Sequence, residues 1–200
     1  MLETKEFKFV RNILWPFKST LKISDEGFEN KGTLVRWNDI TKFNYGIQSI
    51  NGAMTYIFNF HDKQGKRKNI TFTVALTGKK AKKAMMHEIY MRMDQGFNEK
   101  LIIPQANQII KDLNEGKSTE LAGCQLSQKG LEVKAGLIKK KAVFIPWEKA
   151  ALNHPDGAGG FFVHSVDDPK TGALLLYLNK NGLRQLEHVI REIGAARFGK

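Results

Sequence analysis

Residues 21–29 read LKISDEGFE, and residues 124–132 read CQLSQKGLE. Both stretches contain an apolar residue, Ser, two polar residues, Gly, an apolar residue and Glu. Gly27 and Gly130 share one position in this pattern, at an offset of 103 residues. Gly27 is predicted to form a tight turn between two strands, because glycine adopts a positive φ at little cost, and Gly130 lies in the matching turn of the second stretch. The pattern predicts that one structural unit occurs twice in the chain.

Two further landmarks follow this turn in the same order in both halves. VRWNDI at residues 35–40 corresponds to IPWEKA at residues 145–150 at an offset of 110, so the second copy has seven extra residues around residues 136–142. His87-Glu88-Ile89 corresponds to His188-Val189-Ile190 at an offset of 101. We therefore predict two tandem copies, with a first domain at 1–98, a linker or lead-in helix at 99–118 and a second domain at 119–200.

Alternation of polar and apolar residues predicts antiparallel strands in the first copy. These strands are expected at Thr20–Ser24, Phe28–Asn30, Thr33–Trp37, Ile40–Tyr45, Met54–Phe60 and Asn69–Leu76, with a hairpin connection at Asp62–Gly65. A helix over Lys79–Met93, with Thr77 as its N-cap, is predicted from the helical spacing of Ala81, Ala84, Met85, Ile89 and Met93.

The second copy repeats this plan. Its strands are expected at Leu131–Val133, Ala142–Trp147, Phe161–Val166 and Ala173–Leu178, with a hairpin loop at Asp167–Gly172. A helix over Gly182–Ala196, capped by Asn179 or Asn181, is expected to bury Leu183, Leu186, Val189, Ile190 and Ile193. Between the copies, a short helix is predicted from Pro104 to Leu113 and ends at Gly116. The predicted fold class is mainly β: two antiparallel meanders of six or seven strands, each covered by one C-terminal helix.

The LSxxGL turn at residues 126–131, the tryptophan step and the terminal helix together resemble the pleckstrin-homology-like barrel, in particular bacterial forms related to GRAM domains. The lead-in at residues 113–117 is similar to the entrance of such domains. The second copy departs from the pattern at Ala150, where the usual large apolar residue is missing. The resemblance implies two tandem barrels, and it implies lipid-headgroup contacts in early loops between strands.

The charge balance is the one unusual feature of the composition. The chain has 32 Lys and Arg against 20 Asp and Glu, a formal net charge of +12. The first hundred residues carry a net charge of +8 and the second hundred +4, so the excess is not a detachable tail. Such a charge favours an anionic partner: nucleic acid, a membrane surface or an acidic protein.

Three basic clusters are the candidate anion-binding or lipid-binding residues. The alternative interpretation is that they are solvated loops and a solvated helix start. Lysines in a first helical turn oppose the helix dipole, and a helix N-terminus with added lysines suits a phosphate, so the middle cluster favours anion binding. The candidates are Lys66, Arg67, Lys68, Lys79, Lys80, Lys82, Lys83, Lys139, Lys140 and Lys141.

The sequence contains no recognisable catalytic or cofactor motif, so we expect no enzyme activity and no cofactor. The GKS at residues 116–118 lacks the glycine that a P-loop needs five residues earlier, and Met91 occupies the place of the second histidine of a zinc-protease motif. The single cysteine, Cys124, excludes an internal disulfide framework and a cysteine-based zinc cluster, and we expect a buried, inert thiol. Trp37 and Trp147 are either core residues, which we favour, or ligand-stacking residues.

No apolar run is long enough for a transmembrane helix, and the N-terminus lacks the core of a signal peptide. We therefore expect a cytoplasmic protein, with peripheral attachment at the inner face of the membrane as a further possibility. The first functional hypothesis is a non-enzymatic binding or scaffold module that engages a protein or peptide partner or an anionic membrane surface. The alternative is nucleic-acid binding through the basic faces, with Phe58, Phe60 and Phe72 as a stacking platform; we prefer these rings in the core.

Overall fold

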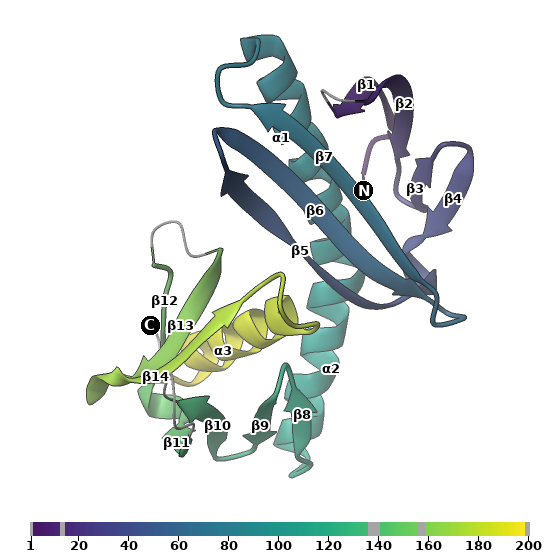
Figure 1. Cartoon of the computed structure of the whole chain (residues 1–200). Coiled ribbons are helices and arrows are strands. Elements are labelled where there is room, and N and C mark those ends of the chain that lie inside the picture. Colours follow the sequence, from purple (N-terminus) through teal and green to yellow (C-terminus); the bar gives the residue numbers. More distant parts are fainter. Residues whose placement is uncertain (1, 13–14, 136–140, 156–158, 199–200) are drawn as a thin grey trace. The chain divides into compact units, whose positions relative to one another are not determined.

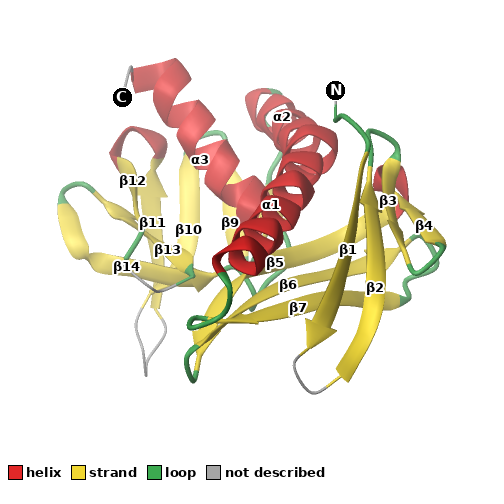
Figure 2. Ribbon diagram, turned by 90° about the horizontal axis from the view of Figure 1, so that it is seen from above, coloured by secondary structure: helices red, strands yellow, loops and turns green. Residues whose placement is uncertain are grey.

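The computed structural model describes residues 2–12, 15–135, 141–155 and 159–198. The chain divides into two compact units, Met1–Leu101 and Ile102–Lys200, and the division falls within the segment 99–118 that was predicted as a linker. In the described part of each unit, four strands are followed by a 3-10 turn, three more strands and a helix (Figures 1 and 2).

The first unit contains two antiparallel sheets. Its four-stranded sheet consists, in order, of β1 (Lys5–Asn12), β2 (Trp15–Ile23), β3 (Gly27–Asn30) and β4 (Thr33–Arg36). After the turn η1 (Trp37–Asp39), a three-stranded sheet consists of β5 (Ile40–Ile50), β6 (Ala53–Asp62) and β7 (Arg67–Ala75). The helix α1 (Lys80–Phe97) then packs on β7, and stacked aromatic rings from β5, β6 and α1 fill the core.

The second unit begins with the helix α2 (Ile103–Asn114), which packs on the final helix, α3 (Leu183–Phe198). Its four-stranded sheet consists of β8 (Thr119–Leu121), β9 (Cys124–Ser127), β10 (Gly130–Ala135) and β11 (Lys141–Pro146). The turn η3 (Trp147–Lys149) leads into a three-stranded sheet of β12 (Ala150–Asn153), β13 (Gly160–Ser165) and β14 (Asp168–Leu176). The core of this unit is largely aliphatic.

The predicted mainly β architecture, with antiparallel sheets and a C-terminal helix, is confirmed. No strand pairing among the described residues closes a four-stranded and a three-stranded sheet into a barrel. Three strands, β1, β8 and β12, were missed, and β9 was expected only as the strand before the turn at Gly130. β1 shows the alternation of Phe7 and Phe9 with charged residues and was detectable, whereas β8 and β12 have only three and four residues and are too short for a period to appear.

The two turn glycines have equivalent surroundings, but the predicted reason for glycine is wrong. Neither Gly27 nor Gly130 is among the described glycines with positive φ. A Cβ on Gly27 would lie 2.1 Å from the carbonyl oxygen of Val35, and one on Gly130 would lie 2.3 Å from that of Ile145. The close approach of the next strand, rather than the backbone angle, therefore excludes a side chain at both positions.

The two tryptophans also make the same contacts in both units. Trp37 donates its indole N–H to the carbonyl oxygen of Ser24 at 3.1 Å, and Trp147 donates to that of Ser127 at 2.9 Å. Their exposed fractions are 1% and 3%. The predicted core role of both tryptophans is confirmed, because a buried indole requires a partner for its N–H group and each has one.

The helix α1 lies directly on Trp37. A Cβ on Gly96 would lie 2.3 Å from the Trp37 ring, so glycine is the residue that allows the helix to approach so closely. The ring of Phe97 meets the same indole edge-on, with 5.4 Å between ring centroids. Helix, turn and first sheet of the unit therefore meet at a single side chain.

The start of α1 differs from the prediction. The N-cap is Lys79, without a capping side-chain hydrogen bond, rather than Thr77. Ala81 and Ala84 are exposed, and the first buried residue is Met86. The first turns of the helix therefore cover no part of the core. The helical spacing of apolar residues in these turns does not indicate that they are buried.

The second unit confirms the predicted helix face and corrects one hairpin. All five residues predicted to be buried in α3 are buried. The buried positions of α1 and α3 correspond at an offset of 100, as for Met86 and Leu186, and not at 101. The loop predicted at Asp167–Gly172 is wrong: Ser165 pairs with Asp168, so the turn has two residues and the start of β14 is irregular.

A π-helical turn, η2 (Asn98–Ile102), lies between α1 and α2. Pro104 lies in the first turn of α2 and has no N–H to donate to a carbonyl four residues earlier, which interrupts the α-helical pattern. At the other end of α2, Gly116 has a φ of +81° and its N–H donates to the carbonyl of Leu113 at 3.1 Å. The predicted helix and its glycine stop are confirmed.

The close approach at Gly130 gives a stability prediction. Gly130→Ala is expected to lower the free energy of unfolding by about 1–3 kcal/mol, because its Cβ overlaps a backbone oxygen that cannot rotate away. The matched control is Gly194→Ala in α3, where a Cβ meets nothing within 4 Å and stability should rise by up to about 1 kcal/mol. Urea unfolding followed by circular dichroism measures both. Equal effects of the two variants would contradict the packing argument.

Candidate functional site

The most basic part of the chain is residues 63–87, which contain eight Lys or Arg and no Asp or Glu. The structure places these cations in two groups at opposite ends of β7 (Figure 1). One group lies in the β6–β7 hairpin and at the start of β7, and the other lies at the start of α1. Nine strand residues at about 3.3 Å each separate the groups by nearly 30 Å, so they do not form one site.

The hairpin group is partly neutralised by carboxylates. Lys68 Nζ lies 3.1 Å from Asp62 Oδ2, and Lys63 Nζ lies 2.7 Å from Asp39 Oδ1. Burial raises the pKa of Asp62, but the backbone N–H of Lys66 and the ammonium of Lys68 outweigh it and hold this pKa below its usual value. Lys66 and Arg67 are exposed and have no ion pair within the described residues.

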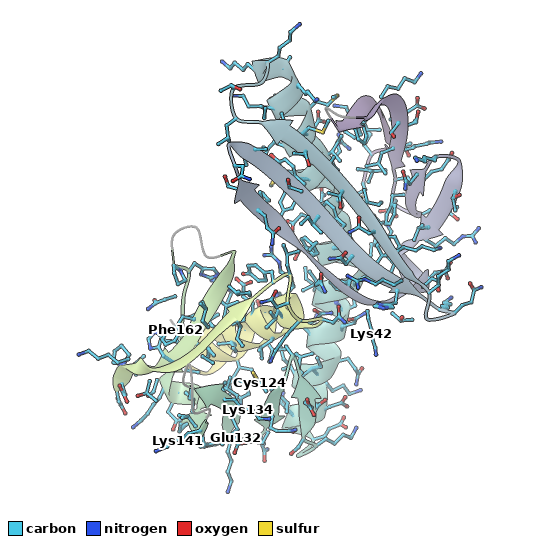
Figure 3. The ribbon with its side chains drawn as sticks, viewed as in Figure 1. Lys42, Cys124, Glu132, Lys134, Lys141 and Phe162 are labelled. Carbon is cyan, nitrogen blue, oxygen red and sulfur yellow. The ribbon has the colours of Figure 1, made fainter. Side chains whose placement is uncertain are left out.

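The second group comprises Lys79, Lys80, Lys82 and Lys83, here called the α1-start lysines. None of the four forms a salt bridge with any residue that the structure describes, and the first turn of α1 contains no acidic residue. Lys79 and Lys80 are exposed, whereas Lys83 Nζ donates to the carbonyl oxygen of Leu76 at 3.0 Å. Figure 3 shows nitrogen-tipped side chains projecting from this end of α1. Four cations therefore share one helix start without internal compensation.

The third predicted cluster belongs to the second unit. Lys139 and Lys140 lie outside the described residues. Lys141 is exposed at the first position of β11, where it pairs with Ala135 of β10 (Figure 3). Among the eight described candidates, the four α1-start lysines form the larger group without carboxylate partners, and Lys66 and Arg67 form a smaller one.

The three core phenylalanines and Cys124 are buried structural residues. Phe58, Phe60 and Phe72 are at most 2% exposed, so they form core rather than a base-stacking platform. Cys124 is 1% exposed, and burial raises the pKa of its thiol to about 11, which keeps it protonated and unreactive. Within the described residues, no group of three or more His, Cys, Asp or Glu could hold a metal ion.

A polar cluster around Glu187 in the second unit was missed by the sequence analysis. The Tyr177 hydroxyl donates to Glu187 Oε2 at 2.6 Å, and the Arg191 guanidinium donates to Oε1 at 3.0 Å. His154 Nε2 lies 3.0 Å from the same Oε1. These residues come from three different elements, and no local motif connects them. The cluster ties α3 to the end of β14 and to the residue after β12.

A groove of about 650 Å³ on the first unit was also missed. It lies between the N-terminal residues and the outer face of α1, and its lining includes Leu2, Glu88, Met91, Asp94 and Glu99. Among its carboxylates, Glu88 pairs with the cations Lys5 and Arg92, whereas Asp94 accepts from the neutral Tyr45 hydroxyl at 2.7 Å. The groove is therefore lined by more carboxylates than cations, and it does not offer a site for an anion.

The chain was compared with models of protein families, with curated proteins and with solved structures, and none of the three comparisons found a match. No helix within the described residues has both the length and the apolar character needed to cross a membrane.

The Glu187 cluster predicts a pH dependence of stability. Burial raises the pKa of Glu187, but hydrogen bonds from Tyr177 and Arg191 outweigh it and lower this pKa below its usual value. A lowered carboxyl pKa contributes stability above the unfolded-state pKa of about 4.3, and the contribution is lost as pH falls through the folded-state value. Wild type should therefore lose stability steeply in urea titrations between about pH 5 and pH 3.

Glu187→Gln should flatten this dependence and lower stability at pH 7 by about 1–3 kcal/mol, because the buried hydroxyl of Tyr177 and the exposed guanidinium of Arg191 lose a charged acceptor. The control is Glu192→Gln, which changes an exposed carboxylate on the same helix and should leave both quantities unchanged. If Glu187→Gln lost stability on acidification as steeply as the wild type, Glu187 would not be the group responsible for the pH dependence.

Proposed function

We propose that the protein is a non-enzymatic binding protein with two pleckstrin-homology-like domains, and that its first domain attaches to an anionic membrane surface through the α1-start lysines. The observation that carries this proposal is the absence of carboxylate partners for these lysines in the described part of the chain. Some other described lysines are paired, for example Lys100 with Asp25 at 2.7 Å and Lys117 with Glu115 at 2.8 Å, but no other run of four cations along a helix start is left without a carboxylate among the described residues.

The order of elements supports the family resemblance. Four antiparallel strands, three antiparallel strands and a C-terminal helix occur in each unit, with the same hydrogen bond from the tryptophan of the 3-10 turn to a serine carbonyl. The proposal includes the closure of the four-stranded and three-stranded sheets of each unit into one barrel. Attachment at the inner face of the membrane would be peripheral and reversible.

The energetics of four lysines fit reversible attachment. A lysine close to an anionic leaflet contributes about 1 kcal/mol, so four contribute about 4 kcal/mol and raise membrane partitioning by roughly a thousandfold. Lysines paired to a carboxylate within the protein contribute little of this. A protein or peptide partner is the alternative occupant, and nucleic acid is less favoured because the aromatic side chains that could stack on bases are buried.

Co-sedimentation with vesicles tests the proposal. The triple variant Lys79→Gln, Lys80→Gln, Lys82→Gln should bind phosphatidylserine vesicles about 100-fold more weakly than wild type, because it removes about 3 kcal/mol of electrostatic attraction. Binding of the wild type should also fall as salt is raised, because salt screens exposed charges.

The matched control removes the same charge elsewhere, as Lys42→Gln, Lys66→Gln, Arg67→Gln. These three exposed cations lie at the opposite end of the three-stranded sheet, where Lys42 and Arg67 both pair with His61 (Figure 3). Equal losses in both triple variants would show that only net charge matters. If the wild type does not bind vesicles at low salt, the membrane proposal is overturned in favour of a protein or peptide partner. A gel shift with single- and double-stranded DNA tests the nucleic-acid alternative.

A further inference from the structure

An exposed leucine lies beside the α1-start lysines. Leu76 is in the short connection between the end of β7 and the start of α1, and it is 44% exposed. Single exposed leucines are common in soluble proteins, but this one is followed within seven residues by four lysines that have no carboxylate partner among the described residues. We infer that Leu76 is the apolar side chain that the first unit inserts into the anionic bilayer. This inference rests on the proposed function and names the part of the surface that enters the lipid.

Hydrogen bonds within the first unit fix the backbone of this connection. The N–H of Leu76 donates to the carbonyl of Gly52 in the β5–β6 turn at 2.8 Å, and the N–H of Gly78 donates to the carbonyl of Ala75 at 2.8 Å. The carbonyl of Leu76 accepts from Lys83 Nζ at 3.0 Å. Both polar backbone groups of Leu76 therefore have partners, so moving this residue out of water leaves neither unsatisfied.

The neighbouring charges have the sign that insertion requires. The β5–β6 turn at residues 51–52 and the connection at residues 76–79 contain no Asp or Glu. A carboxylate here would be repelled by phosphatidylserine headgroups, whereas lysines place their ammonium groups at headgroup depth while their aliphatic stems follow the apolar surface. Leu76 and the lysines can thus act on one leaflet at the same time.

The leucine also distinguishes binding to a bilayer from binding to a soluble polyanion. Lysines attract phosphate groups of either kind, but only a bilayer offers an apolar phase below the charged layer. A leucine that moves into this phase adds a contribution that salt does not screen. Removing it should therefore weaken membrane binding at high and low salt by the same factor, whereas removing a lysine should matter mainly at low salt.

The first test places a reporter at the proposed depth. Leu76→Cys is labelled with the environment-sensitive fluorophore NBD, and the native Cys124 stays unlabelled because it is 1% exposed. The matched control is Leu34→Cys on β4, where the leucine is 42% exposed but pairs across the sheet with Glu29. Phosphatidylserine vesicles should raise and blue-shift the emission at position 76 and leave that at position 34 unchanged. Vesicles of phosphatidylcholine alone and single-stranded DNA should change neither.

The second test measures affinity. Leu76→Ala should lower the affinity for phosphatidylserine vesicles about fivefold, because roughly half of a leucine side chain is withdrawn from lipid. Leu34→Ala should have no effect. If the vesicles still co-sediment with the wild type but Leu76→Ala binds equally well and the label at position 76 is silent, the inference is overturned while the proposed function stands. If the label responds equally to DNA, the bilayer is not the specific occupant. If no vesicle binds, both proposals fail.

Discussion

In each unit, a buried tryptophan donates its indole N–H to the carbonyl of the serine that lies three residues before the close-approach glycine, Gly27 or Gly130. Trp37 and Trp147 follow the last strand of a four-stranded sheet and precede the first strand of a three-stranded sheet. Each indole therefore joins the end of one sheet to an earlier turn of the same sheet. In the first unit it also receives α1, through Gly96 and the ring of Phe97. A large ring that needs one polar partner can occupy only one orientation here, and the sheets and the helix are arranged around it.

The same framework carries different surfaces in the two units. At the start of α1 the cations have no carboxylate partner within the described residues. At the start of α3, by contrast, the Arg184 guanidinium lies 3.6 Å from the centroid of the Tyr177 ring and close to Glu187. The second unit therefore compensates its helix charges internally, through the cluster around Glu187. The basic composition alone does not distinguish these two cases, because it counts paired and unpaired cations alike.

Local sequence patterns predicted much of the fold but misjudged several ends. The five buried residues of α3 follow from their spacing, since a long amphipathic helix has a strong period. Thr77 was misplaced as a cap and Ala81 as a buried residue, because the first turns of α1 have no neighbouring sheet to cover. For the candidate site, the sequence identified the α1-start lysines. It could not show that Lys63 and Lys68 meet carboxylates, or that Leu76 remains exposed, since those outcomes depend on chain folding around them.

The sequence by itself determined that one unit occurs twice, that the units are built mainly of antiparallel strands, and that Trp37 and Trp147 belong to their cores. These conclusions depend on short-range periods and on a repeat, which are properties of the linear chain. Only the tertiary structure decided why Gly27 must be glycine and which cations face solvent without a partner. Both depend on atoms distant in sequence: the Val35 carbonyl that excludes a side chain, and the carboxylates that neutralise the β6–β7 hairpin but are absent from the described surroundings of the α1-start lysines.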